Sequence, residues 1–98
     1  MNVRYDILPT VSLTSPANGD SFVFGTTIHL TAIANDSDGL VSEVQFYIYP
    51  GSQRISVYSS PYEFDWTPDT RGQYSVVAIA IDNDNWSSVT PDILISVQ

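Results

Sequence analysis

The chain has 98 residues, a length typical of one domain with its own hydrophobic core. Hydrophobic residues make up 43% of it, and no apolar run approaches the ~18 residues of a membrane-spanning helix. Eleven acidic residues against three arginines give a formal charge of −8, which argues against nucleic acid and anionic membranes as partners and favours cations. Cysteine is absent, which excludes disulfides, thiolate metal sites and cysteine nucleophiles.

The first eight residues are interpreted as a linker or as residues added for expression, and the domain is predicted over residues 9–98. The sequence MNVRYDIL has neither the basic start nor the long apolar stretch of a signal peptide. Because Met1 is the only methionine, we expect it to begin an expressed fragment of a longer protein.

Apolar residues alternate with a period of two along most of the chain, and no segment keeps a helical spacing over three turns, which predicts a β protein. The first strand is predicted over residues 10–15. It ends at the turn sequence PANGD, in which Asn and Gly tolerate positive φ. A short edge segment over residues 21–24 follows and stops at Gly25.

Two long strands are predicted next, over residues 26–34 and 41–49, with the polar loop NDSDG between them. Because successive side chains of a strand point to opposite faces, each strand has a core-facing and an outward-facing set. The core-facing residues are Ile28, Leu30, Ala32, Ala34, Val44, Phe46 and Ile48, and the outward-facing ones include His29, Tyr47 and Tyr49.

Four further strands are predicted in the second half of the chain. A short strand over residues 55–58 precedes residues 62–66, whose three aromatic side chains should fill the middle of the fold. Residues 73–81 are apolar on both faces, which predicts a central strand. The last strand, residues 89–97, contains Pro91 and suits an edge or a bulge. Seven to eight short strands separated by turns predict an all-β sandwich of two sheets.

Several short motifs between residues 9 and 97 carry a family resemblance through their order and spacing. They read PxVxLxSPxNG from Pro9, LxAxAxDxDGxVxxVxFY from Leu30, PYxFxW from Pro61, GxY from Gly72 and AxAxDN from Ala78. Together they resemble the bacterial immunoglobulin-like (Big-type) domains of secreted modular proteins. Two features depart from the family pattern: Asn85 stands where Gly is frequent, and the hairpin over residues 53–56 lacks a second Gly.

The resemblance implies an immunoglobulin-like Greek-key β-sandwich that carries no chemistry of its own. It implies an accessory or spacer module of a secreted or cell-surface bacterial protein, such as a glycoside hydrolase or an adhesin. We expect a monomer that requires no cofactor and whose partners are neighbouring domains of the same polypeptide. Gly72-x-Tyr74 resembles the tyrosine corner of sandwich folds, in which the Tyr hydroxyl bonds to nearby backbone.

Two acidic loops are predicted to meet at one end of such a sandwich, because they would be its B–C and F–G loops. Crowded carboxylates repel one another unless they are solvated or bridged by a cation, and Ca²⁺ takes oxygen ligands of this kind. Turn formation by Asp and Asn is the alternative explanation of both loops. A calcium ion there would stiffen a junction between modules. The candidate ligands are Asp36, Asp38, Asp82 and Asp84.

Exposed aromatic residues define the second candidate function, a carbohydrate- or protein-binding module. Tyr47 and Tyr49 share the outward face of one strand, and Trp86 follows the second acidic loop. Aromatic rings at these positions could stack on sugar rings, whereas cross-strand packing explains them without a ligand.

The single histidine, His29, lies in mid-strand with no Ser or Cys near it in sequence, which favours a surface or cross-strand role. Paired carboxylates for glycoside hydrolysis would need a substrate cleft between them. A domain this small with a filled core has no room for one, so we expect no enzymatic activity and assign no catalytic residue.

Overall fold

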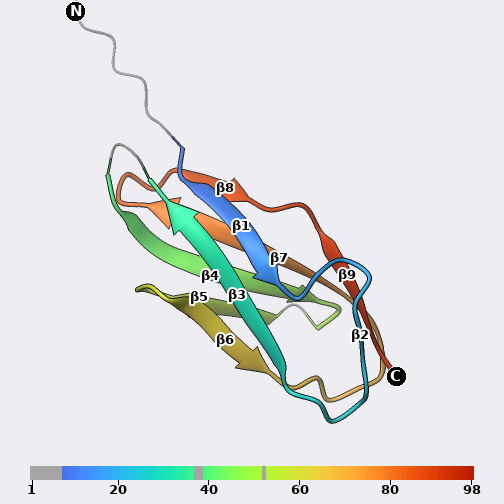
Figure 1. Cartoon of the computed structure of the whole chain (residues 1–98). Helices are drawn as coiled ribbons and strands as arrows, with labels where there is room; N and C mark the ends of the chain where they lie inside the picture. Colours follow the sequence, from blue (N-terminus) through green and yellow to red (C-terminus); the bar gives the residue numbers. More distant parts are fainter. Residues whose placement is uncertain (1–7, 37–38, 52) are drawn as a thin grey trace, which may run out of the picture.

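The computed structural model describes residues 8–36, 39–51 and 53–98, and in these ranges the chain forms nine β-strands and no helix (Figure 1). The described part of the chain therefore contains no helix that could span a membrane. The strands pack as two sheets, which confirms the predicted immunoglobulin-like β-sandwich.

The smaller sheet has the order β1–β3–β6 and is antiparallel throughout. Its strands are β1 (Thr10–Ser15), β3 (Ile28–Asn35) and β6 (Tyr62–Trp66). The larger sheet has the order β2–β9–β7–β4–β5, and β8 pairs with β7 beyond the end of β9. Its strands are β2 (Ser21–Phe22), β4 (Val41–Tyr49), β5 (Gln53–Val57), β7 (Gly72–Asp82), β8 (Ser87–Val89) and β9 (Ile93–Val97).

The core lies between the sheets and consists of the side chains that the alternation directs inward. The chain changes sheet between β1 and β2, β2 and β3, β3 and β4, β5 and β6, and β6 and β7, so both sheets contribute to the core. The buried core residues are Ile28, Leu30, Ala32, Val44, Phe46, Ile48, Tyr62, Trp66, Tyr74, Val76, Ala78, Ala80, Ile95 and Val97. Removing this apolar area from water is the main contribution to stability, at roughly 25 cal/mol per Å².

The predicted strand over residues 89–97 is split into β8 and β9, as the proline in it suggested. Pro91 has no N–H to donate to the ladder. At this interruption the buried Thr90 bonds to β7 instead, since its N–H donates to the Ala78 carbonyl (2.9 Å) and its hydroxyl accepts the Ala78 N–H (2.9 Å). β7 itself lies between β4 and β9, which confirms the central position predicted from its two apolar faces.

The chain enters the domain at one end of the sandwich and leaves it at the other (Figure 1). Thr10 at the start of β1 pairs with Asn35 at the end of β3, beside the loops that follow β3 and β7. We call this end the apex, formed by Asp36, Leu40, Asp82, Asp84 and Trp86. The opposite end, formed by Val23, Phe24, Arg71 and Gln98, is called the base.

Candidate functional site

The turn between β7 and β8 at the apex is organised by one buried carboxylate. Asp82 is 2% exposed, and its Oδ1 accepts the backbone N–H groups of Asp84 and Trp86, both at 2.9 Å. Its own backbone N–H donates to the Trp86 carbonyl (2.9 Å). Asn85 has φ = 67°, a left-handed conformation that Asn tolerates better than most residues.

The loop after β3 is held against this turn by a second set of hydrogen bonds. The Asn83 N–H donates to the Leu40 carbonyl (3.0 Å), and the Leu40 N–H donates to Asn83 Oδ1 (3.1 Å). Gly39 packs so closely here that a Cβ on it would lie 2.5 Å from Asn83 Oδ1. The two acidic loops therefore meet, as their assignment to the B–C and F–G loops predicted.

The four aspartates proposed as calcium ligands have different environments. Asp82 is buried and bonded to the turn, Asp36 is half-buried with its Oδ2 shielded from solvent, and Asp84 is exposed. Asp38 lies outside the described residues. Within the described residues no three His, Cys, Asp or Glu side chains form a metal-binding group. Calcium binding therefore stays a prediction, while the hydrogen bonds of Asp82 give this residue a structural role in the turn.

The three aromatic residues proposed for ligand binding do not form one surface. Tyr47 and Tyr49 pack edge to face, with ring centroids 4.7 Å apart at 71°, and the Arg54 guanidinium lies 4.9 Å from the Tyr47 ring centre. Trp86 belongs to the apex. Tyr47 pairs with Val77 of β7, whereas Trp86 lies beside Asp82, five residues further along that strand, so the two aromatic residues are about 16 Å apart. Cross-strand packing accounts for Tyr47, whereas Tyr49 and Trp86 remain exposed.

His29 lies on the outer face of the smaller sheet, between two carboxylates of the neighbouring strand. Its Nδ1 bonds to Asp65, its register partner on β6, and its Nε2 lies 2.7 Å from Glu63 Oε1. These hydrogen bonds, first to Asp65 and then to Glu63, raise the pKa of His29 above its usual 6.5. The expected cross-strand role of His29 is confirmed. The residues before and after it in the strand, Ile28 and Leu30, point into the core.

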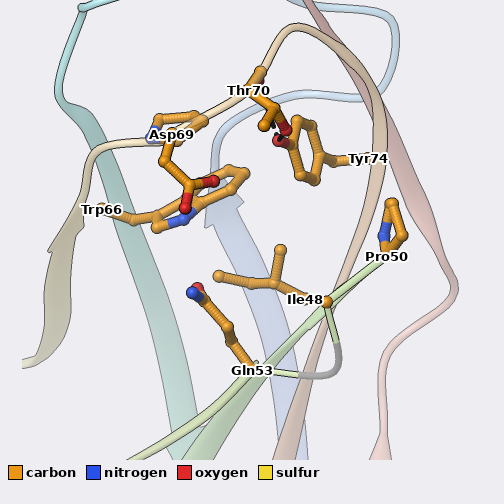
Figure 2. Close-up of a pocket in the computed structure, with 9 residues that line it drawn as sticks. Ile48, Pro50, Gln53, Trp66, Asp69, Thr70 and Tyr74 are labelled. Carbon is orange, nitrogen blue, oxygen red and sulfur yellow. Dashed lines mark hydrogen bonds between the residues drawn. The ribbon is translucent and has the colours of Figure 1, made fainter.

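A cavity of about 390 Å³ lies near the base, between the β4–β5 turn and the loop after β6 (Figure 2). It is lined by the rings of Trp66 and Tyr74 and by the polar side chains of Gln53 and Asp69. The Tyr74 hydroxyl donates to the Thr70 carbonyl (2.8 Å), which confirms the tyrosine corner. The sequence alone did not predict this cavity. Its only signal in the sequence is a pair of turns, around Pro50 and Pro68, which lie at the same end of the sandwich and both line the cavity.

Residues 9–78 match the model of the bacterial Ig domain family, and this match covers more than half of the chain. The chain is a bacterial Ig domain. The match covers the strands and loops from β1 into β7, including the loop that carries Asp36 and the aromatic strand β6. The family assignment agrees with the resemblance carried by the sequence motifs.

Two of the solved structures that are similar to this bacterial Ig domain come from named proteins. The first, described as Clostridium thermocellum CbhA fibronectin(III)-like modules, is 31% identical with a TM-score of 0.84, over 97% of this chain and 49% of that one. The second, a PKD domain of an M14-like peptidase from Thermoplasmatales archaeon SCGC AB-540-F20, is 28% identical with a TM-score of 0.55, over 92% of each chain. This bacterial Ig domain thus spans about half the length of the CbhA chain. None of the curated proteins matches it.

Proposed function

We propose that this bacterial Ig domain is a non-catalytic accessory or spacer module of a secreted or cell-surface multidomain protein. The observation that carries the proposal is the path of the chain, which enters at the apex and leaves at the base (Figure 1). Such a path connects a preceding and a following domain in line, at opposite ends of a rigid body. A filled core between the sheets gives that body its stiffness.

The multidomain context is supported by the CbhA structure, whose chain is about twice as long as the matched part and is described as modules. A secreted glycoside hydrolase or an adhesin is the kind of parent protein that we propose. In either parent the domain would set the distance between neighbours and would act on no substrate itself.

A second candidate function is binding of polysaccharide, favoured by the exposure of Tyr49 and Trp86. Aromatic faces of this kind can stack on sugar rings, as they do on other planar or apolar ligands. Against this role, Tyr49 packs edge to face on Tyr47 and Trp86 lies at the far end of β7. A flat platform of two or three rings is therefore not formed by these residues.

Retention on insoluble polysaccharides distinguishes the two functions. For a spacer we expect no retention of the chain in pull-down or affinity electrophoresis. Clear retention that is abolished by Tyr47→Ala, Tyr49→Ala or Trp86→Ala would reverse the ranking. Val89→Ala is the matched control, since Val89 is also an exposed apolar residue but has no aromatic ring.

We also propose that calcium stiffens the apex, where Asp36, Asp82 and Asp84 come from two loops in contact. Asp82 Oδ1 already accepts two N–H groups, so an ion there would use its Oδ2 together with oxygens of the other loop.

A further inference from the structure

The turn between β1 and β2 contains Asn18–Gly19, the one Asn-Gly pair in the sequence. Asparagine is a thermally labile residue, because the backbone nitrogen of the next residue can attack its side-chain amide. Glycine in the next position favours the attack, since it has no Cβ to obstruct the approach of its nitrogen. Both residues are exposed, so water can reach the reacting groups. The local sequence therefore favours deamidation of Asn18.

Deamidation of such a pair proceeds through a cyclic imide and consumes only water. The Gly19 nitrogen loses its proton and bonds to Cγ of Asn18. The bond from Cγ to the side-chain nitrogen breaks, and ammonia leaves with the proton that Gly19 gave up. Water then opens the resulting succinimide ring at one or the other of its carbonyl carbons, which leaves aspartate or isoaspartate at position 18. No group is oxidised or reduced, so the reaction needs no cofactor.

The folded structure engages both reacting groups in hydrogen bonds to one residue of β9, Leu94. The Gly19 N–H donates to the Leu94 carbonyl (2.7 Å), and the Leu94 N–H donates to Asn18 Oδ1 (2.9 Å). We call these two bonds the Leu94 pairing. It continues the parallel ladder between β2 and β9, in which Ser21 is the register partner of Ser96. The Asn18 side chain thus takes the place of a backbone carbonyl in this ladder.

The Leu94 pairing opposes ring closure in two ways. A hydrogen bond donated by an N–H group stabilises its protonated form, so the Gly19 nitrogen loses its proton less readily. Closing the ring also brings Asn18 Oδ1 close to the Gly19 nitrogen, whereas the pairing holds these two atoms on the separate N–H and carbonyl groups of Leu94. The reaction therefore requires the pairing to open.

The strand that follows the Asn-Gly pair is weakly anchored. β2 has only two residues, Ser21 and Phe22, and lies at the edge of the larger sheet, where β9 is its one partner strand among the described residues. Phe22 is only partly buried where it packs against the core. Segments with few buried contacts open locally without unfolding of the whole domain. The fraction of time that β2 spends apart from β9 should therefore set the rate of the reaction.

We propose that Asn18 is a site of spontaneous deamidation that the Leu94 pairing controls, so that conversion occurs only while β2 is separated from β9. The loss of ammonia makes the conversion irreversible. Isoaspartate also adds a methylene group to the backbone, so the groups at positions 18 and 19 no longer match the N–H and carbonyl of Leu94. Each conversion to isoaspartate thus leaves the contact between β2 and β9 permanently weaker.

Mass spectrometry of the full chain at mildly alkaline pH tests this proposal. Deamidation replaces an amino group by a hydroxyl group, and peptide mapping locates the resulting mass increase at Asn18. We expect the folded chain to convert about 10- to 1,000-fold more slowly than the chain unfolded in urea, because a minor open state is typically populated at about 0.1–10%. Asn18→Gln should abolish the mass increase at this position, since its longer side chain would have to close a larger ring.

Two substitutions distinguish local opening of β2 from unfolding of the whole domain. Phe22 and Ile55 are both partly buried against the core and lie on the opposite edge strands of the larger sheet, β2 and β5. Phe22→Ala should accelerate conversion of the folded chain roughly tenfold, because it removes the apolar anchor of β2. Ile55→Ala is the matched control and should leave the rate nearly unchanged at temperatures where both variants are folded.

Three results would overturn the inference. Equal rates in the folded and the urea-unfolded chain would show that the Leu94 pairing does not protect Asn18. Faster conversion in the folded chain would show that the Leu94 N–H promotes the attack by stabilising negative charge on Oδ1. Equal effects of Phe22→Ala and Ile55→Ala would show that the opening of β2 is not the event that admits the reaction.

Discussion

At the scale of single residues, Asp82 shows how a buried carboxylate can serve the fold. A buried charge is tolerated only when its hydrogen-bonding capacity is used, and Asp82 Oδ1 accepts two backbone N–H groups at 2.9 Å. Hydrogen bonds to a charged group are worth about 1.5–3 kcal/mol each in mutational series. The DNDN sequence that begins at the last residue of β7 is therefore explained as a turn, whether or not a cation also binds there.

His29 provides a prediction about the pH dependence of stability. Because the pKa of His29 is raised in the folded state above the value of about 6.5 in the unfolded state, the protonated ring stabilises the fold. This contribution is fully present below pH 6.5 and is lost as the pH rises through the raised pKa. We expect the melting temperature of the natural chain to exceed that of His29→Gln at acidic pH, and the difference to shrink at alkaline pH.

The measurement is a pair of thermal melts followed by circular dichroism, at pH about 5.5 and about 9. Comparing the two chains at each pH removes the effects of the other titrating carboxylates. A double substitution of Glu63→Gln and Asp65→Asn should remove the pH dependence of the difference. A melting-temperature difference that grows with pH would refute this account of the His29 contacts.

At the scale of elements, the contact between the β3–β4 loop and the β7–β8 turn depends on the absence of a side chain at Gly39. The backbone of Gly39 lies outside the left-handed region, so only the 2.5 Å approach of its Cβ position to Asn83 Oδ1 excludes alanine. We expect Gly39→Ala to displace Asn83 from the Leu40 N–H and to destabilise the domain by about 1–3 kcal/mol.

Urea unfolding of a double-mutant cycle measures this effect. In an Asn83→Ala background the obstructing atom is absent, so Gly39→Ala should cost much less there, with a coupling energy of about 0.5–3 kcal/mol. Removing a glycine where the new residue fits can even stabilise a protein through its unfolded state, by about 0.4–1 kcal/mol. Equal costs of Gly39→Ala in both backgrounds would show that the clash is not with Asn83.

The strands could be predicted because their side-chain alternation and their burial follow the same period of two. β1, β4 and β6 begin and end at the predicted residues, since a proline or a glycine lies within two residues outside each boundary. The strand predicted over residues 21–24 ends at Phe22 in the structure. The next two residues, Val23 and Phe24, belong to a turn that contains Gly25 at φ = 95°. β5 begins at Gln53, earlier than predicted, because Gln53 pairs with Ile48 of β4. Where this strand begins therefore depends on its partner strand and not on the local sequence.

The candidate sites were less predictable, because they depend on which loops meet and on how each side chain is used. The meeting of the two acidic loops followed from strand order, but the burial of Asp82 did not, since an aspartate in a turn sequence is usually exposed. The cross-strand partners of His29 required the register of β3 against β6. The cavity near Trp66 required the packing of two loops that are distant in sequence.

At the scale of the whole molecule, the net charge of −8 bears on how calcium binding must be tested. Any salt screens the self-repulsion of an acidic protein, so a rise in melting temperature with CaCl₂ is not specific by itself. If the apex binds Ca²⁺ with the ~10⁻⁴ M affinity of extracellular modules, millimolar calcium should add about 1 to 2 kcal/mol of stability.

Calorimetric melts in EDTA and in about 5 mM CaCl₂ check this prediction, with NaCl at the same ionic strength as the control for screening. Asp84→Asn should reduce the calcium-specific increase, whereas Asp92→Asn, an exposed aspartate outside the apex, should leave it intact. A melting temperature that is the same in EDTA and in CaCl₂ would rule out a site of this affinity.

The parallel pairing of β2 with β9 gives the domain a mechanical property. A force that draws the last residue away from the apex acts along β9, across the slanted backbone hydrogen bonds of this parallel pairing. The bonds are therefore loaded in shear and must break together, whereas a strand peeled from its end loses them one at a time. A polypeptide stretched between two anchored neighbours would be clamped at its C-terminal strand by Gly19 N–Leu94 O (2.7 Å), Ser96 N–Asp20 O (3.0 Å), Gln98 N–Phe22 O (2.8 Å) and Phe24 N–Gln98 O (2.7 Å).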